Sequence, residues 1–161
     1  FSLGADIPFW FCRKSAIVTG KGENVLKIEN NYENFFVLLV NPMIEVSTKK
    51  IFEKLTITTR KDFTIFDEKF LSSTQIVDFL NSRSNDLEKP AILQCEEIKN
   101  ILDVFKNETN SLLSRMTGSG STCFALFKNK KDLGNAERIF RNKFKNFWVK
   151  KTKIVNSFDT L

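Results

Sequence analysis

The apolar pattern of the first 42 residues predicts a hairpin followed by a buried strand. The stretch SAIVTGKGENVLKI, residues 15–28, places apolar residues on both sides of a glycine-containing turn, which is typical of a half-buried hairpin. The apolar run FFVLLV, residues 35–40, is followed by Asn41 and Pro42. Proline has no backbone N–H and holds the preceding residue in extended backbone. The run therefore predicts a strand that ends near Asn41.

Helical spacing dominates the middle of the chain and a segment near its end. The segment EVSTKKIFEKL, residues 45–55, predicts a helix with Ser47 or Thr48 as its N-cap. Apolar residues recur every three or four positions over 95–107 and again over 133–144. The other expected elements are short helices over 74–82 and 87–95, a loop over 56–73, and strands over 121–128 and 147–155.

The order of these elements indicates the fold class. From residue 35 it reads strand, helices, strand, helix, strand, which is typical of an α+β domain with helices on one face of a small sheet. Residues 1–34 do not join this layout, and we interpret them as the end of a preceding domain. Because the chain begins with Phe1 rather than Met, we expect that a further segment precedes it.

Composition narrows the possible chemistry. The chain has 161 residues and no His, which excludes Ser-His and Cys-His catalysis and nearly all common zinc sites. Its three Cys are widely and irregularly spaced, which favours free thiols and a cytoplasmic setting over a disulfide framework. No apolar run is long enough to cross a membrane. We expect no metal site and no membrane contact.

The net charge of +6 comes largely from lysines after residue 127. Such a cluster fits either a nucleic-acid surface or a solvated helix face on a lysine-rich chain. No RNA-binding aromatic motif accompanies it. The solvated face is therefore the favoured interpretation.

Two short segments are candidates for a binding or catalytic site. In MTGSGST, residues 116–122, glycines permit positive φ and successive N–H groups can form an anion-binding nest. We expect a helix ending near Leu113 before this loop and a strand after it, which is the reverse of a P-loop, and the loop lacks the P-loop lysine. A structural turn and a ligand loop both stay open. In LGADIPF, Asp6 is either an N-cap or turn aspartate, or a general base or electrostatic partner for a hydroxyl nucleophile.

Four segments occur together in one order: LGADIPFWF, GKGENV, LLVNPMIEVSTKKIF and SRMTGSGSTCFALF. In this combination the chain resembles the C-terminal portion of the 4-diphosphocytidyl-2-C-methyl-D-erythritol kinase family, within the GHMP kinase superfamily. The resemblance runs from Leu3 to Phe127 and is weaker beyond. It implies a ferredoxin-like C-terminal GHMP kinase domain over 35–161. It also implies that 1–34 form the end of an N-terminal domain related to ribosomal protein S5 domain 2.

The resemblance implies a transferase that phosphorylates a hydroxyl of 4-diphosphocytidyl-2-C-methyl-D-erythritol with ATP and Mg²⁺, in non-mevalonate isoprenoid biosynthesis. Asp6 matches the family's catalytic aspartate, which takes or orients the proton of the attacking hydroxyl. Phe52 matches an aromatic that stacks on cytosine, with an ordinary core position as the alternative. Thr48 is a candidate substrate contact, with an N-cap role alone as the alternative. The residues that would line the substrate end of the cleft are Gly118, Ser119, Gly120 and Ser121.

Other parts of the family's site do not occur in this sequence: the glycine-rich ATP loop, the catalytic lysine, and the aromatic and His of the cytosine pocket. The resemblance therefore implies that the partner of this chain is the N-terminal half of the kinase, and that the chain alone is inactive. Two alternatives stay open. One is a catalytically dead, truncated remnant of the kinase, and the other is a basic RNA-binding module, which would need exposed aromatics on the sheet face.

Overall fold

The computed structural model describes residues 16–20, 22–27, 29–30, 35–55, 69–70 and 72–154. The chain divides into two compact units. The described part of the first unit contains strands β1, β2, β3 and β5 and the start of helix α3. The second unit contains the rest of α3 and all the other described elements.

The first unit contains the hairpin that the glycine-flanked apolar pattern predicts. Strand β1 (Ala16–Thr19) pairs antiparallel with β2 (Asn24–Lys27). Gly20, with φ of 72°, begins the turn between them. Strand β3 (Glu29–Asn30) pairs in parallel with β5 (Lys69–Phe70). The prediction of an uninterrupted loop over 56–73 is therefore wrong at β5, because these two residues pair with β3, about 40 positions earlier in the chain.

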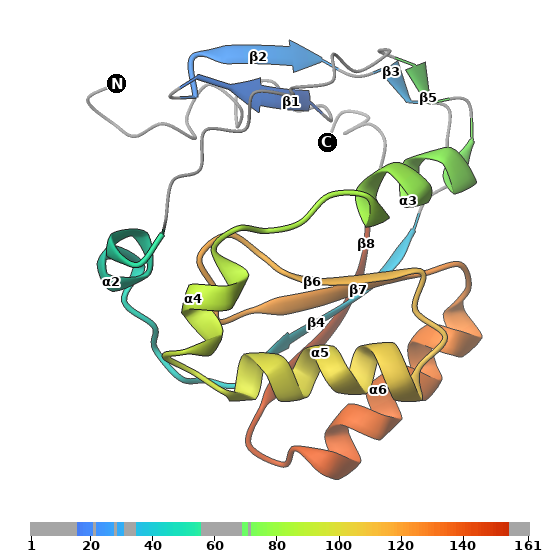
Figure 1. The fold of residues 1–161 in the computed structure, drawn as a ribbon. Helices are drawn as coiled ribbons and strands as arrows, with labels where there is room; N and C mark the ends of the chain where they lie inside the picture. The colour runs from blue at the N-terminus through green and yellow to red at the C-terminus, as the bar shows by residue number, and fades with distance from the viewer. Residues whose placement is uncertain are drawn as a thin grey trace, which may run out of the picture. The chain divides into compact units, whose positions relative to one another are not determined.

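The second unit is built on a four-stranded antiparallel sheet with the strand order β6-β7-β4-β8 (Figure 1). Its two central strands are the first and third along the chain, and helices connect the first strand to the second and the third to the fourth. This is the ferredoxin-like arrangement, so the predicted α+β class is confirmed. The strands are β4 (Phe36–Asn41), β6 (Leu113–Met116), β7 (Cys123–Phe127) and β8 (Trp148–Lys153).

The helices follow the predicted spacing. Ser47, rather than Thr48, is the N-cap of the helix after β4, because its hydroxyl accepts a hydrogen bond from the backbone N–H of Lys50 at 3.3 Å. At the start of the last helix, the Asn129 side chain accepts from the N–H of Asp132 at 2.9 Å. The helices are α2 (Thr48–Glu53), α3 (Ser73–Asn81), α4 (Glu88–Ile92), α5 (Glu97–Glu108) and α6 (Lys130–Lys143).

Strand β6 corrects the sequence prediction. A helix was expected to continue to about Leu113, but α5 ends at Glu108 and β6 follows before the glycine loop. Only the first and last residues of β6 are buried, and Ser114 and Arg115 lie between them, so no period-2 apolar pattern marks this strand. Its pairing with β7, with Leu113 opposite Leu126, defines it instead.

The core lies between the sheet and helices α5 and α6, which cover one of its faces (Figure 1). The Phe105 and Phe140 rings, from the two helices, lie with centroids 4.5 Å apart and are fully buried. Truncating either to Ala would cost about 3–5 kcal/mol of stability. Leu38 and Val40 of β4 pack against the same cluster.

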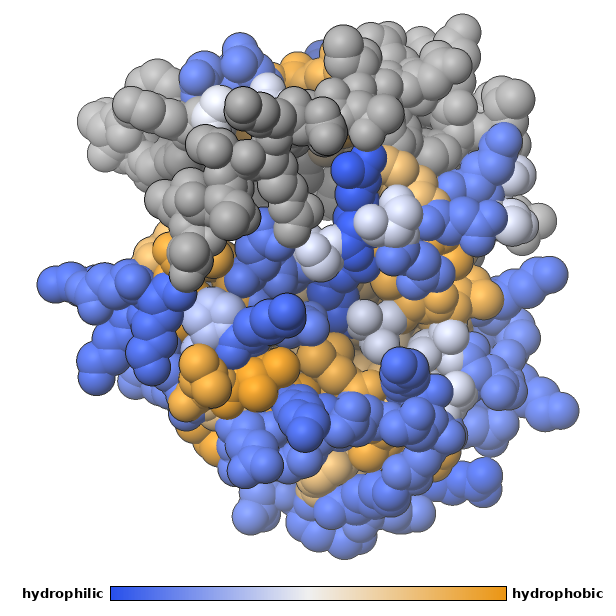
Figure 2. All heavy atoms as spheres, in the orientation of Figure 1, coloured by the Kyte–Doolittle hydropathy of each residue, from blue (hydrophilic) through white to orange (hydrophobic). Residues whose placement is uncertain are grey.

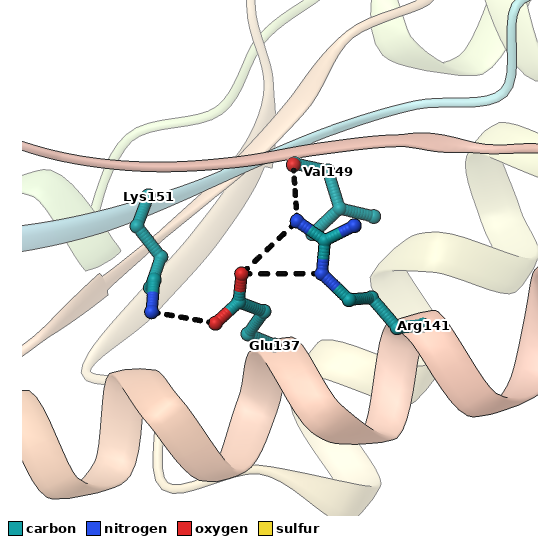
Figure 3. A network of polar contacts seen from close by, with 4 residues as sticks. All are labelled: Glu137, Arg141, Val149 and Lys151. Carbon is teal, nitrogen blue, oxygen red and sulfur yellow. Dashed lines mark hydrogen bonds and ion pairs between the residues drawn. The ribbon is translucent and has the colours of Figure 1, made fainter.

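A polar network ties α6 to the edge strand β8 (Figure 3). One Glu137 oxygen accepts from Arg141 at 3.0 Å, and the other accepts from Lys151 at 2.6 Å. Arg141 also donates to the carbonyl of Val149 at 3.1 Å. The contact with Lys151, followed by that with Arg141, holds the pKa of Glu137 below its usual value. Within the described ranges, no helix combines the length and apolarity needed to cross a bilayer.

Candidate functional site

The glycine loop forms the turn of the β6–β7 hairpin. The N–H of Thr117 donates to the carbonyl of Thr122 at 2.9 Å, and the N–H of Gly120 donates to the carbonyl of Thr117 at 3.0 Å. Because β6 precedes the loop, its order is strand, loop, strand rather than the expected helix, loop, strand. A P-loop passes from a strand into a helix, so the loop still differs from a P-loop.

The two glycines of the loop have different roles. Gly118 has φ of 55°, and a Cβ built there would meet nothing within 4 Å. Gly120 has φ of 91°, and a Cβ there would lie 2.8 Å from the sulfur of Met116 and 3.5 Å from Ile98 Cδ1. Gly120 therefore allows the loop to pack on the core, while Gly118 leaves open space beside the backbone.

Two predicted site residues that are far apart in sequence come together here. The hydroxyl oxygens of Thr48 and Ser119 lie 3.0 Å apart, within hydrogen-bond distance. Since Ser47 caps α2, the hydroxyl of Thr48 is not the cap and can face the loop. The start of α2 and the tip of the glycine loop thus form one polar surface.

Phe52 belongs to the same helix face as Thr48, because residues four apart in a helix are neighbours. Its side chain is 56% exposed, whereas the adjacent Ile51 is fully buried. Phe52 is therefore not part of the core, and the alternative interpretation of it as an ordinary core residue is wrong. An exposed aromatic one helical turn from the contact between Thr48 and Ser119 can stack on a planar ring.

Ser121 uses its hydroxyl inside the protein. It is 6% exposed, and its Oγ donates to the carbonyl of Ile44 at 2.7 Å. The neighbouring Thr122 accepts at its Oγ1 from the Asn41 amide at 2.7 Å. These bonds tie the loop to the segment after β4. The sequence predicts Asn41 only as the end of a strand. Its hydrogen bond to Thr122, 81 positions away, leaves no pattern in the neighbouring sequence from which it could be predicted.

Arg115, the third residue of β6, also uses its side chain for hydrogen bonds within the protein. Its guanidinium donates to the carbonyls of Leu80 and Arg83 at 2.6 and 2.7 Å. Burial lowers its pKa from the usual value, since desolvation disfavours the charged form. Both donated bonds lead to backbone around the end of α3, so this cation holds β6 against that segment.

Apolar side chains gather near the site. Met43 and Ile44, in the segment between β4 and α2, and Leu93, just after α4, are all exposed. Figure 2 shows apolar surface at the lower left, where Figure 1 draws the end of α4 and the start of α5. Together with Phe52, these residues give the second unit apolar surface beside the polar loop.

Several kinds of chemistry are not supported by the part of the chain that the structure describes. It contains no group of three or more Cys, Asp and Glu side chains that could hold a metal ion. Burial, followed by the negative charge of Glu88, raises the pKa of Cys123 to about 12, so this thiol is not a nucleophile near neutral pH. The candidate base Asp6 lies outside the described residues. What the described site can do is bind a ring and hydrogen-bonding groups.

Comparisons with known proteins agree with this arrangement. Residues 68–146 match the family described as GHMP kinases C terminal. The chain is 31% identical over 160 residues to the 4-diphosphocytidyl-2-C-methyl-D-erythritol kinase of Anaplasma phagocytophilum (strain HZ), covering 99% of this chain and 53% of that protein. The chain thus spans about half the length of the curated relatives it matches.

Solved structures show the same fold. The crystal structure of a 4-(cytidine 5'-diphospho)-2C-methyl-D-erythritol kinase superposes with a TM-score of 0.64 at 20% identity, over 93% of this chain and 54% of that one. The homoserine kinase of Cytophaga hutchinsonii gives a TM-score of 0.58 at 13% identity, over 88% of this chain and 48% of that one. Residues 68–146 of this chain thus match the C-terminal domain of the GHMP kinase family, and the solved structures share the fold of the ferredoxin-like sheet.

Proposed function

We propose that this chain is the C-terminal portion of an ATP-dependent kinase that phosphorylates a hydroxyl of 4-diphosphocytidyl-2-C-methyl-D-erythritol in isoprenoid biosynthesis. The relatives with that name support this proposal. The observation that carries it is the 3.0 Å contact between the Thr48 and Ser119 hydroxyls. It unites two segments in which the chain resembles that kinase family, although they are 71 residues apart.

Each residue then has a role that follows from its chemistry. The exposed ring of Phe52 stacks on the cytosine, an interaction worth about 1–3 kcal/mol per base. Ser119 and the open backbone at Gly118 donate hydrogen bonds to polar groups of the substrate. Asp6 accepts or orients the proton of the substrate hydroxyl, whose oxygen forms a bond to the γ-phosphorus as the bond between that phosphorus and the β,γ-bridging oxygen of ATP breaks.

Within the described residues, no group of three or more Cys, Asp and Glu side chains could hold a metal ion, and the family's glycine-rich ATP loop does not occur in this sequence. We therefore assign the binding of ATP and Mg²⁺ to the N-terminal half of the complete kinase. In this proposal residues 1–34 are the end of the N-terminal domain and 35–161 are the C-terminal domain. The free thiols of Cys95 and Cys123 support a cytoplasmic setting.

The binding part of the proposal is tested by titrating the purified chain with cytidine 5'-diphosphate and recording amide NMR shifts. We expect saturable shifts at Thr48, Phe52 and Ser119 with a dissociation constant in the range of about 1 mM, since only part of the pocket is present. F52A should weaken binding at least about fivefold. The control I154A removes another exposed apolar side chain, beside Phe35 at the opposite end of β4 from Asn41, and should bind as the wild type does. Equal losses in both variants would contradict stacking by Phe52.

The catalytic part is tested in two proteins. The chain alone, with ATP, Mg²⁺ and the cytidyl substrate, should show no phosphoryl transfer, and measurable turnover would contradict the assignment of the ATP loop to the other half. In a complete enzyme that joins this chain to an N-terminal kinase half, D6A should lower kcat by about 10²–10⁴. An unchanged kcat would remove Asp6 from catalysis. No turnover in the complete wild-type enzyme would indicate a catalytically dead remnant.

A further inference from the structure

We propose that Asn85 is a positioning residue that holds the glycine loop in its ligand-binding conformation; the nature of that ligand rests on the proposed function. The side-chain amide nitrogen of Asn85 donates to two backbone carbonyls: that of Met116, at the end of β6, at 3.0 Å, and that of Gly118, in the loop, at 2.8 Å. Its amide oxygen accepts from the backbone N–H of Leu87 at 3.0 Å.

These three bonds determine the orientation of the Asn85 amide. An NH₂ group has two protons to donate and the amide oxygen has none, so only this orientation satisfies all three partners. The opposite orientation would place the Asn85 oxygen against the carbonyl oxygens of Met116 and Gly118. A carboxylate of the same size would do the same, because it only accepts. An asparagine at position 85 is therefore specifically suited to this bridge.

The bond to Gly118 controls a group at the tip of the loop. A peptide unit is planar, so fixing the carbonyl of Gly118 also fixes the direction of the following N–H, which belongs to Ser119. Ser119 is the residue whose hydroxyl contacts Thr48. Gly118, with φ of 55° and no neighbour at its Cβ position, has few other restraints. Asn85 thus sets the direction of a donor at the proposed substrate surface.

Asn85 can act in this way because its own segment is anchored. Arg115 donates to the carbonyl of Arg83 at 2.7 Å, two residues before Asn85. The carboxylate of Glu88, three residues after it, accepts from the backbone N–H of Met116 at 3.2 Å. Bonds on both sides of Asn85 therefore hold the segment from 83 to 88 against β6, and Asn85 transmits that rigidity to the loop.

The variant N85D separates this role from the local turn. It keeps an oxygen that can accept from Leu87 but loses both donors to the loop. N85S, which is too short to span the same gap, avoids placing a carboxylate against the two carbonyls and serves if N85D is poorly folded. The control is S84A, which removes only an exposed 3.4 Å contact between the neighbouring Ser84 and Asp86.

The decisive measurement is amide hydrogen exchange in the full chain. In N85D and N85S we expect the protected amides of Thr117 and Gly120 to exchange about tenfold faster or more, while amides of α5 and α6 keep wild-type rates. S84A should match the wild type. Wild-type rates at Thr117 and Gly120 in both Asn85 variants would overturn the proposal, as would an equal acceleration throughout the core.

A second readout is the affinity for cytidine 5'-diphosphate, which a residue that only stabilises the fold would not change. We expect about tenfold weaker binding in N85D and N85S at temperatures where all the variants are fully folded. Faster loop exchange with unchanged affinity would overturn the positioning role. If the wild-type chain shows no shifts with this probe, the proposed function fails, and the exchange rates still decide whether Asn85 orders the loop.

Discussion

Replacing Gly120 with Ala tests how the glycine loop is packed on the core. The positive φ of 91° costs an L-residue about 1–2 kcal/mol. The new methyl would also lie 2.8 Å from the sulfur of Met116. Met116 is only 1% exposed and Ile98 is fully buried, so the flexible Met side chain has little room to move away. Overpacking of this kind adds about 1–3 kcal/mol, so that strain and overpacking together cost about 2–5 kcal/mol in the folded state.

Gly118 provides the matched control for this prediction. It also has positive φ, but a methyl there meets nothing within 4 Å. The strain of about 1–2 kcal/mol is partly offset by about 0.4–1 kcal/mol, because Ala restricts the unfolded chain more than Gly does. G118A should therefore lose at most about 1.6 kcal/mol. The same offset applies to G120A, which should lose about 1–3 kcal/mol more than G118A because of the overpacking.

The assay is urea unfolding of both variants, with the free energy of unfolding taken from linear extrapolation. A double-mutant cycle with M116A identifies the cause. M116A should cost about 1–3 kcal/mol less in the G120A protein than in the wild type, because it removes the crowding side chain. Equal losses in G118A and G120A, or strict additivity with M116A, would refute this account of the packing.

Three further predictions concern single side chains. F52A should change the free energy of unfolding by less than about 0.5 kcal/mol, whereas I51A, at the buried neighbour, should cost about 2–5 kcal/mol in the same urea assay. E137Q should cost about 0.5–1 kcal/mol at pH 7. The contact with Lys151 lowers the folded-state pKa of Glu137, so the stability difference between E137Q and the wild type should persist at pH values above the unfolded-state pKa. It should disappear as the pH falls through the folded-state pKa. A constant difference in the free energy of unfolding from pH 7 to pH 2 would contradict this prediction. Burial raises the pKa of Cys123 to about 12, so this thiol should resist alkylation at pH 8 until denaturant is added. Mass-spectrometric peptide mapping measures the modification. Alkylation of Cys123 in the folded protein at the rate of a free thiol would contradict its burial.

Elements with a clear local pattern could be predicted from the sequence. The apolar run at residues 35–40 predicts β4, because its side chains form one continuous apolar segment that can be buried. The helical spacing after residue 95 predicts α5, because its apolar residues form one continuous face of a helix. Strand β6 could not be predicted in this way. Ser114 and Arg115 interrupt its apolar character, and its pairing with β7 is a tertiary property that no window of sequence contains.

The candidate site was predictable only in part. The sequence motifs singled out Thr48 and Ser119, but their contact spans 71 residues and depends on the fold. The choice between Ser47 and Thr48 as the N-cap was settled by a hydrogen bond of 3.3 Å, which spacing alone does not determine. Asn85 was missed entirely, because its partners lie 31 and 33 residues away and asparagine in a loop is common for local reasons.

The position of β8 gives the late lysines a consequence for self-association. In the described four-stranded sheet β8 is an edge strand, and an unpaired edge is a template for another chain. Lys150, Lys151 and Lys153 are exposed along it, and the Glu137 contact compensates only Lys151. Two copies aligned edge to edge would bring uncompensated ammonium groups together and bury them. The same lysines that raise the net charge thus act as a barrier to β-sheet extension and aggregation.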